Sequence, residues 1–360
     1  MTRRDKTALV DSLRLPPDTS LMKAIEFLTQ QALHKILLIT DDDYRLLGII
    51  TDYDIRRAIL NHVSLDLPVS AVMNPAPMTM AQTCSDAEIM GHMERIGCTQ
   101  MPVVDTQGRV VDVRFIDEFL HFGDNERHEN VVVIMAGGLG TRLRPMTERV
   151  PKPLLTVGGR PLLFILLDQI LTEGFDRVFI SLNYKSDMII KAIREVSSYR
   201  DRVDFLLEGD TMLGTAGSLS LLPERPAAPF VVINGDLLTN VSLKDMLQFH
   251  CSEGNQLTMA VRHEHHKVAY GVVDLDGTRV TGMREKPVFS YYFNTGIYVV
   301  EPAMLETVPP ETTWNMTDLV DGALAKGDRV GAFPVHEFWI DIGTPDQYER
   351  AQSEFEVYFR

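Results

Sequence analysis

The sequence predicts an α/β protein, in which a C-terminal part with a mostly parallel sheet follows a smaller α+β part. Between residues 130 and 360, short apolar segments alternate with segments of helical length, which is typical of βαβ units. Before residue 125, the order helix, strand, turn, strand and helix occurs twice, about 65 residues apart. The two parts are predicted to meet in a polar, turn-rich stretch at residues 121–130.

Composition limits the partners of this chain. Its 360 residues are long enough for two cores, and the net charge of -15 argues against a nucleic-acid partner, which would need clustered Lys and Arg. No segment approaches the ~20 apolar residues of a membrane helix, and no apolar run follows the basic N-terminus as in a secretory signal. Cys84, Cys98 and Cys251 are scattered and fit reduced thiols. A cytoplasmic protein without a membrane partner is therefore expected.

The N-terminal part, residues 1–125, is expected to hold two copies of the repeat, at about 10–62 and 68–122. Each copy is too small to bury much surface alone, so the two copies should pack together. The first copy contains the segment Gly48-Ile-Ile-Thr51-Asp-Tyr-Asp54 at the junction of a strand and a helix. The corresponding segment of the second copy runs from Val110 to Asp117.

The Gly48–Asp54 segment resembles the sequence of CBS domains, and residues 10–122 are similar to a tandem pair of them. The resemblance implies an adenine-nucleotide site formed by Thr51, Asp54 and Asp117, and a homo-oligomer, at least a dimer. The second copy departs from the pattern, because Asp112 replaces the Gly and Arg114 replaces the hydroxyl residue. Arg114 would either contact a phosphate or fill the site. A purely structural module without a ligand is the alternative.

The C-terminal part, residues 130–360, is expected to form one domain. Strands are predicted at 131–135, 177–182, 203–208, 230–234, 256–262, 291–300 and 329–335. Helices are predicted at 161–173, 186–196, 242–252, 316–326 and 345–356, and a hairpin at 270–282 interrupts the alternation.

A glycine-rich turn follows the first of these strands. It reads Gly137-Gly-Leu-Gly140-Thr-Arg142, and Lys152 lies ten residues beyond Arg142. Glycines let the backbone approach an anion and point several N–H groups at it. Arg142 adds bidentate donors and Lys152 a mobile charge. Neither a Walker loop nor a complete dinucleotide fingerprint is present, so another type of phosphate site is expected.

Residues 137–154 resemble the signature of nucleotide-sugar pyrophosphorylases, and further segments of that family follow in order across 130–360. These segments are 213–218, 231–236, 270–273, 284–287, 294–298 and 339–348. The resemblance implies a Rossmann-like, GT-A-like nucleotidyltransferase fold. It also implies an enzyme that joins a nucleoside triphosphate to a sugar 1-phosphate and releases pyrophosphate.

The resemblance also implies roles for individual residues. Arg142 would bind the departing β- and γ-phosphates, Lys152 the α-phosphate and Lys286 the incoming sugar phosphate. Asp236 and Asp341 would hold Mg²⁺ through oxygen ligands. The nucleotide would contact Ala136, Gly137, Gly138, Gly140, Thr141, Glu208, Gly214 and Thr215. The sugar phosphate would contact Gly271, Glu285, Lys286, Asn294 and Thr295.

Glu208 bears on the choice of base. A carboxylate six residues before Gly214 could accept bonds from guanine N1–H and N2–H₂, two donors that uracil lacks. A surface glutamate without contacts is the alternative. The segment 213–217 is also more similar to guanylyltransferases of the mannose 1-phosphate type, so GTP is favoured over UTP or dTTP. A non-catalytic nucleotide sensor is the alternative from another class.

The histidine-rich tract Arg262-His-Glu-His-His-Lys267 is the other candidate metal site in the sequence. It lacks the His-Glu-x-x-His spacing of a helical zinc site and carries flanking positive charge. We interpret it as a solvated loop.

Overall fold

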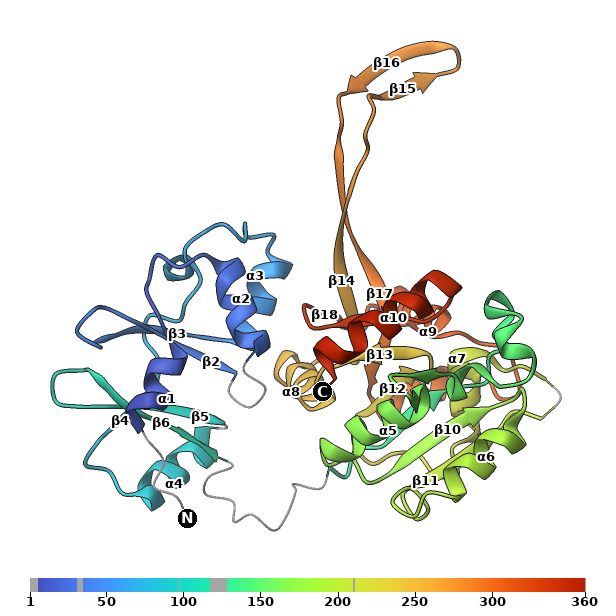
Figure 1. Ribbon diagram of the computed structural model, residues 1–360, viewed down its shortest axis with the longest axis horizontal. Helices are drawn as coiled ribbons and strands as arrows, with labels where there is room; N and C mark the ends of the chain where they lie inside the picture. Colours follow the sequence, from blue (N-terminus) through green and yellow to red (C-terminus); the bar gives the residue numbers. More distant parts are fainter. Residues whose placement is uncertain (1–5, 31–34, 97, 117–127, 210, 360) are drawn as a thin grey trace. The chain divides into compact units, whose positions relative to one another are not determined.

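The computed structural model describes residues 6–30, 35–96, 98–116, 128–209 and 211–359 (Figure 1). The chain forms two compact units, residues 1–125 and 126–360. None of the described helices is both long and apolar enough to cross a membrane.

The first unit contains two three-stranded sheets with the same topology. In each sheet the first strand pairs in parallel with the second, and the second pairs antiparallel with the third. Both antiparallel pairs shift register at equivalent places, at Ile39/Thr40 and at Val103/Val104. The elements are α1 (Lys6–Leu13), β1 (Arg14–Leu15), α2 (Leu21–Gln30), β2 (Ile36–Thr40), β3 (Leu46–Thr51), α3 (Asp52–Leu60), η1 (Val69–Ala71), β4 (Met80–Ala81), α4 (Asp86–Ile96), β5 (Gln100–Val104) and β6 (Val110–Phe115).

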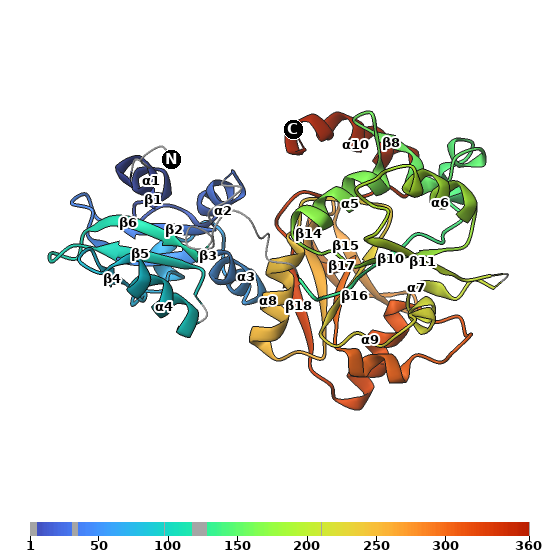
Figure 2. The same cartoon turned by 90° about the horizontal axis from the view of Figure 1, so that it is seen from below.

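The two copies of the repeat pack together, as the sequence predicts. The Leu46 N–H donates to the Gly108 carbonyl at 3.0 Å, and the Val110 N–H donates to the Tyr44 carbonyl at 2.9 Å, so the turns of the two sheets join. One core cluster contains apolar side chains from both copies, among them Leu38 and Val113, and Figure 2 shows the sheets together. Each copy therefore completes the other's core.

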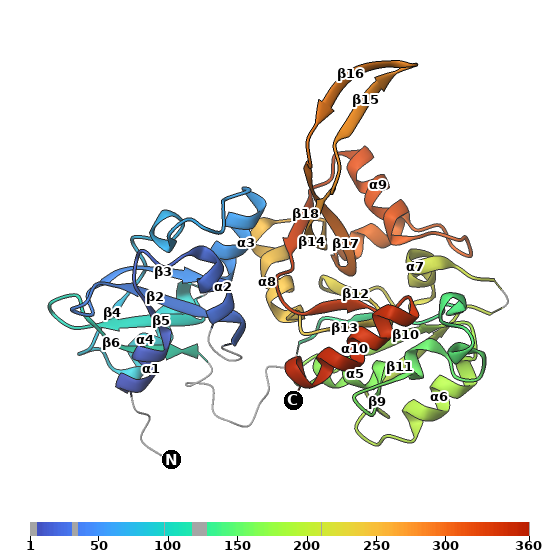
Figure 3. The ribbon, with the colours of Figure 1, turned by 45° about the horizontal axis from the view of Figure 1, so that its top comes forward.

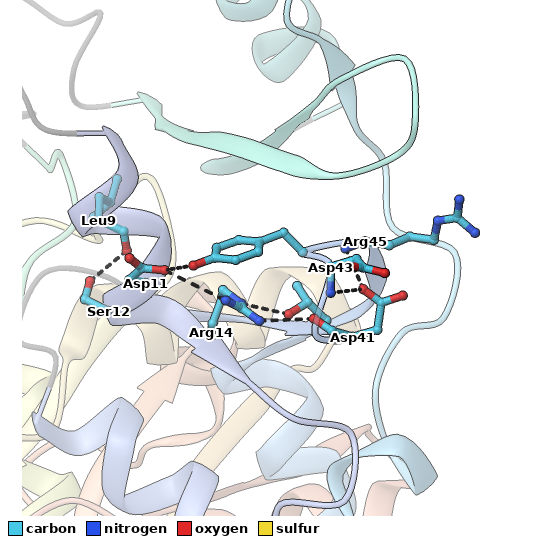
Figure 4. Close-up of polar contacts among 9 residues, drawn as sticks. Leu9, Asp11, Ser12, Arg14, Asp41, Asp43 and Arg45 are labelled. Atoms are coloured by element: carbon cyan, nitrogen blue, oxygen red, sulfur yellow. Dashed lines mark hydrogen bonds and ion pairs between the residues drawn. The ribbon is translucent and has the colours of Figure 1, made fainter.

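Polar contacts of Asp11 in α1 and Arg14 in β1 hold the end of α1 against the β2–β3 turn (Figure 4). The Arg14 guanidinium donates to Thr40 Oγ1 at 2.9 Å and to the Asp41 carbonyl at 3.1 Å, and it lies 3.6 Å from the centroid of the Tyr44 ring. The Tyr44 hydroxyl donates to Asp11 at 2.7 Å. Both the cation–π contact and these hydrogen bonds fix the start of the unit against its sheet.

The second unit is built on a seven-stranded sheet with strand order β11-β10-β7-β12-β17-β14-β18. Only β17 runs antiparallel to its neighbours, so the sheet is mostly parallel. Its strands are β7 (Val132–Met135), β10 (Val178–Leu182), β11 (Val203–Leu207), β12 (Phe230–Asn234), β14 (Leu257–Lys267), β17 (Val288–Val300) and β18 (Val330–Pro334). The shorter strands are β8 (Thr156–Val157), β9 (Arg160–Pro161), β13 (Leu237–Thr239), β15 (Val272–Asp276), β16 (Arg279–Arg284) and β19 (Trp339–Asp341).

Helices cover both faces of this sheet, which is why its central strands are apolar throughout. Figure 2 shows α5 and α6 on one side and α9 on the other. Phe230 and Val232 of β12 belong to the core cluster that α9 completes with Met316 and Leu319. The helices are α5 (Leu162–Thr172), α6 (Ser186–Arg194), α7 (Gly214–Gly217), α8 (Leu243–Glu253), α9 (Met316–Lys326) and α10 (Pro345–Tyr358). Short 3₁₀ segments are η3 (Thr141–Leu143), η4 (Met146–Glu148), η5 (Lys152–Leu154), η6 (Ser218–Leu221) and η7 (Pro302–Thr307).

Strands β14 and β17 continue beyond the sheet as a two-stranded ribbon that ends in the β15–β16 hairpin (Figures 1 and 3). We call residues 262–293 the arm. The interpretation of the histidine tract as a loop is wrong, because His263, His265 and His266 are in β14 and pair with β17. The His263 ring stacks on Tyr292 with centroids 4.6 Å apart. Cross-strand pairing of this kind stabilises polar residues in a strand.

Candidate active site

The candidate site lies beside β7, where the order in which the chain adds strands to the sheet changes from one side of β7 to the other. From β7 the chain proceeds through β10 to β11 on one side, and β12 then pairs with the other side of β7. Loops that leave the carboxyl ends of two such strands diverge and form a crevice. The glycine-rich turn follows β7, and Asp236 follows β12 two residues after Asn234. The fold therefore brings these two segments together.

The glycine-rich turn is held in a conformation that requires glycine at position 140. Gly140 has a φ of +62°, and a Cβ there would lie 3.0 Å from Thr147 Cγ2 and 3.3 Å from Lys152 Cβ. The Thr147 hydroxyl, which is buried, donates to the Gly140 carbonyl at 2.8 Å. Thr147 thus positions the turn. The sequence places this threonine in the motif but does not reveal that contact.

Four charged side chains meet at this crevice. The Lys152 ammonium donates to Asp236 and lies 3.8 Å from Asp341 Oδ1. Asp341 ends β19, which pairs with β13 so that Asp341 stands opposite Leu237, and the Ile342 N–H donates to the Asp236 carbonyl at 3.0 Å. Arg142 is the fourth charged side chain. Its guanidinium lies beside Gly343, two residues beyond Asp341, because a Cβ built on Gly343 would be 3.3 Å from Arg142 Nη2.

The electrostatics of the crevice suit a bound cation. Burial raises the pKa of Asp341, the Asp236 carboxylate raises it further, and the charges of Lys152 and Arg142 lower it. In the described part of the chain, Asp341 Oδ1 is buried without a hydrogen-bond partner. Two adjacent carboxylates, one with a buried oxygen that accepts no hydrogen bond from the described residues, are the donor set that a hard divalent cation prefers. Asp236 and Asp341 could therefore hold such an ion.

The raised pKa of Asp341 predicts that this carboxylate destabilises the metal-free fold. The folded state binds the Asp341 proton more tightly than the unfolded state, so stability falls as pH rises through the unfolded and then the folded pKa. At pH 7 in a chelator, Asp341→Asn should raise the Tm by about 2 °C, which corresponds to roughly 1 kcal/mol. Calorimetry measures this. Excess Mg²⁺ should stabilise the wild type more than the variant, and a lower Tm for the metal-free variant would contradict the prediction.

Glu208 faces the glycine-rich turn. Its Oε1 accepts from the Ser181 hydroxyl at 2.7 Å, its Oε2 accepts from the Leu213 N–H at 2.8 Å, and a Cβ on Gly137 would lie 2.7 Å from Oε1. The alternative of a glutamate without contacts is therefore wrong. Ser181, which the sequence does not single out, orients this carboxylate. Each oxygen keeps a lone pair for a further donor.

The loop at residues 213–217 is fixed against the segment before α9. Gly214 has a φ of +76°, and a Cβ there would lie 2.7 Å from the Trp314 carbonyl. The Thr215 hydroxyl accepts from the Met316 N–H at 2.9 Å, so it supports the start of α9. Ala136, Gly138 and Thr141 lie in the turn after β7. The predicted nucleotide residues therefore surround the carboxyl ends of β7 and β11.

The predicted sugar-phosphate residues are not gathered in one place. Gly271, Glu285 and Lys286 lie in the arm, where a Cβ on Gly271 would be 3.1 Å from Glu285 Oε2. Within the described residues, neither Glu285 nor Lys286 contacts Arg142, Lys152 or the two acids, and the hairpin beside them stands clear of the unit in Figure 1.

Asn294 and Thr295 lie where the arm joins the sheet. The Asn294 amide donates to the Tyr298 hydroxyl, and its Oδ1 accepts from the Gly296 N–H at 2.9 Å. Thr295 is buried, and its hydroxyl donates to the Ala260 carbonyl at 2.9 Å. The Thr295 hydroxyl therefore already has a structural partner, and of the two residues only Asn294 is exposed.

In the first unit, Thr51 and Asp54 form a capping box at the start of α3. The Thr51 N–H and hydroxyl donate to Asp54 Oδ2 at 2.8 and 2.7 Å. Arg114 pairs with Asp86 at 2.5 Å and keeps the pKa of that carboxyl below its ordinary value. Asp112 pairs with Lys6 at 2.8 Å. Asp117 lies outside the described residues.

Comparison with known proteins places these features in context. The family model described as nucleotidyl transferase matches residues 131–357, and the one described as CBS domain matches residues 10–61. A mannose-1-phosphate guanyltransferase of Aspergillus oryzae is 30% identical over 225 residues, which cover 60% of this chain and 61% of the relative. The beta-B protein of the same name from Xenopus laevis is 33% identical over 224 residues, with coverages of 60% and 62%. The chain thus matches about three fifths of the length of these relatives.

Solved structures show the same fold. HddC from Yersinia pseudotuberculosis, complexed with GMP-PN, has a TM-score of 0.50 and 28% identity, and the match covers 63% of this chain and 99% of HddC. A putative glucose-1-phosphate thymidylyltransferase from Bacillus anthracis also has a TM-score of 0.50, with 20% identity and coverages of 64% and 95%. The second similarity supports the fold alone.

Proposed function

The chain belongs to the nucleotidyl transferase family through residues 131–357, and from this premise we propose that it makes a nucleoside diphosphate sugar from a nucleoside triphosphate and a sugar 1-phosphate. The observation that carries the proposal is the meeting of Arg142, Lys152, Asp236 and Asp341 beside a glycine-rich turn. Such a set of charges suits two anionic reactants, which repel each other unless their charge is neutralised.

In the proposed reaction, an oxygen of the sugar phosphate attacks the α-phosphorus in line. The new P–O bond forms as the bond between the α-phosphorus and the bridging oxygen breaks, and pyrophosphate leaves. No general base is needed, because the attacking phosphate is already ionised. Arg142 would hold the β- and γ-phosphates and Lys152 the α-phosphate. Asp236 and Asp341 would hold Mg²⁺, which neutralises charge on the reactants.

We propose GTP as the nucleotide. Glu208 supports this choice, because its carboxylate faces the turn and is oriented by Ser181 and the Leu213 N–H. It can accept from the N–H groups of guanine, which uracil and thymine do not present in the same pattern. Uridylyl or thymidylyl transfer is the alternative within the same chemistry, and a nucleotide-sensing protein without catalysis is the alternative from another class.

Pyrophosphate release tests the proposal and the choice of base together. Purified chain with Mg²⁺ is assayed against four triphosphates and a panel of sugar 1-phosphates, with GTP expected to react fastest. Glu208→Gln should lower the preference for GTP over UTP by about 10- to 100-fold, because one bidentate contact discriminates by ~1–3 kcal/mol. A matched control is Glu224→Gln on the surface. If no pair releases pyrophosphate, the sensor alternative holds.

We propose that the first unit binds an adenine nucleotide and regulates the enzyme, and that the protein is a cytoplasmic homo-oligomer. The capping box leaves one Asp54 oxygen without a partner among its described contacts, since Oδ2 accepts both bonds from Thr51. A ribose hydroxyl could bind there. The free cysteines Cys84, Cys98 and Cys251 are consistent with a reducing compartment.

Calorimetric titration of the full chain with ATP, ADP and AMP tests the regulatory site. Asp54→Ala should weaken binding at the first unit, with at least a tenfold rise in Kd, because a charged hydrogen-bond acceptor is removed. Asp43→Ala, on the turn at the opposite end of β3, is the control and should leave the Kd unchanged. Equal heats from both variants would show that the capping box has a structural role only.

A further inference from the structure

The arm carries an apolar face that its own chain leaves uncovered. In the β15–β16 hairpin, Val273 pairs with Met283 and Leu275 with Val280, so these four side chains share one face. Leu275, Val280 and Met283 are each at least 60% exposed. The other face is charged, with an ion pair between Arg284 and Asp274. One clean apolar face on an antiparallel hairpin is typical of a surface that packs against something.

The arm also carries residues that the proposed reaction needs elsewhere. Glu285 and Lys286 directly follow β16, and no described contact joins them to the crevice of their own chain. At that crevice, Lys152 is paired with Asp236 and Asp341. The proposed reaction assigns Arg142 to the phosphates of the nucleoside triphosphate. Among the described contacts, none brings a further cation to these four side chains for an incoming sugar phosphate, and none gives Lys286 a partner.

The same chain has exposed apolar side chains beside the glycine-rich turn, which we call the rim. Leu139 of the glycine-rich turn, Leu207 at the end of β11 and Met212 before α7 are all exposed. They lie at or after the carboxyl ends of β7 and β11, which is the same end of the sheet at which Asp236 follows β12. The arm has five basic, four acidic and three histidine side chains, whereas the whole chain has a net charge of -15. An apolar arm with a net charge of +1 therefore complements a chain that is acidic overall and has an apolar rim.

We propose that the arm docks on a second copy of this chain and supplies Glu285 and Lys286 to the partner's active site, a proposal that rests on the proposed function. The apolar face of the hairpin packs on the partner's rim, and Lys286 meets the sugar phosphate bound beside the partner's acids. In a symmetric dimer the exchange is reciprocal, so each site is completed by the other chain. In this arrangement the described residues of one chain assemble the nucleotide half of the site, and the partner's arm completes it.

Complementation between two inactive variants tests the exchange. One chain carries Asp236→Asn and the other carries Glu285→Ala with Lys286→Ala, and both are co-expressed with different tags and isolated as hybrids by two affinity steps. If the arm acts on the partner, each hybrid dimer has one intact site of two, and the isolated hybrids regain roughly half of the wild-type rate. If it acts within its own chain, no site is intact and the hybrids stay inactive, which overturns the inference.

Two comparisons make the outcome unambiguous. A hybrid of Asp236→Asn with Lys152→Met, both in the body of the unit, has no intact site in either arrangement and should stay inactive. The wild type reports the proposed function separately: an inactive wild type would defeat that function, whereas an active wild type with inactive hybrids would defeat only the exchange. Full activity of the double arm variant alone would also overturn the inference, because the arm would then supply nothing.

A second measurement does not depend on activity. A photo-cross-linking phenylalanine derivative placed at Leu275, on the apolar face, should join two copies covalently on illumination of the full chain. The same group at Asp276, on the charged face, is the matched control and should give several-fold less product. Cross-links within one chain, or equal yields at the two positions, would overturn the docking of the apolar face on a second copy.

Discussion

Asp236→Asn is expected to lower the rate of pyrophosphate release by about 10³-fold, or ~4 kcal/mol in the transition state. The substitution keeps the shape of the side chain but removes the charge that faces Lys152 and Asp341. An amide binds a divalent cation more weakly than a carboxylate does, and one acid alone holds it loosely. The measurement is kcat under saturating substrates while Mg²⁺ is titrated.

The control for this substitution is Asp204→Asn, an exposed aspartate on β11. It removes the same charge from the chain without touching the crevice and should leave kcat within about twofold, as surface changes usually do. An Asp236→Asn enzyme that keeps more than a tenth of the wild-type rate at every Mg²⁺ concentration would contradict the assignment of Asp236 as a cation ligand.

Lys152→Met is expected to lower kcat by about 10²- to 10³-fold, the loss that follows removal of one donor to a charged transition state. It has a second consequence, because the Lys152 charge lowers the pKa of Asp341. Without that charge the pKa of Asp341 rises further. The acid limb of the pH–rate profile should therefore move to higher pH, since Asp341 becomes protonated before it does in the wild type.

The pH profile separates this role from a merely structural one. Lys191→Met, on the exposed side of α6, is the control and should change neither kcat nor the acid limb. If Lys152→Met raises KM while kcat and the pH profile stay as in the wild type, then Lys152 contributes to binding of the ground state only. That result would contradict its assignment to the α-phosphate.

Much of the fold follows from local signals in the sequence. The predicted limits of strand 230–234 and helix 316–326 coincide with β12 and α9. For the helix the reason is visible in its ends: Asn315 forms a capping box at the start, and Gly327 ends it with a φ of +79°. Local chemistry fixes both ends of this helix, so sequence alone suffices there.

The arm could not be predicted in the same way. The predicted strand limits at 262 and 291 fall short of the observed ends of β14 and β17 at Lys267 and Val288. Residues 263–267 are polar and lack the alternation of a half-buried strand. They are extended because they pair with residues 288–292, more than 20 positions further along, and such pairing leaves no local signal.

The candidate site shows the same division. The glycine-rich turn and Asp236 each follow an apolar strand, so their meeting can be inferred from the topology of parallel sheets. Asp341 is different, because β19 pairs with β13 outside the main sheet. Only the resemblance to a family connects it with Asp236 before the structure does. Neither the motif nor the topology indicates that Glu285 and Lys286 stand apart from the crevice of their own chain.

Trp339 connects the base of the arm with the short strand that carries Asp341. Its indole N–H donates to the Thr295 carbonyl at 3.0 Å, and its own carbonyl accepts from Arg262 at 3.2 Å. Asp341 is two residues away on the same short strand. Side-chain changes at Thr295 or Arg262 can therefore tilt that carboxylate while leaving every reactant contact chemically unaltered. A slower reaction in such variants would therefore indicate that the Asp341 carboxylate is misaligned, and not that contacts with the sugar are lost.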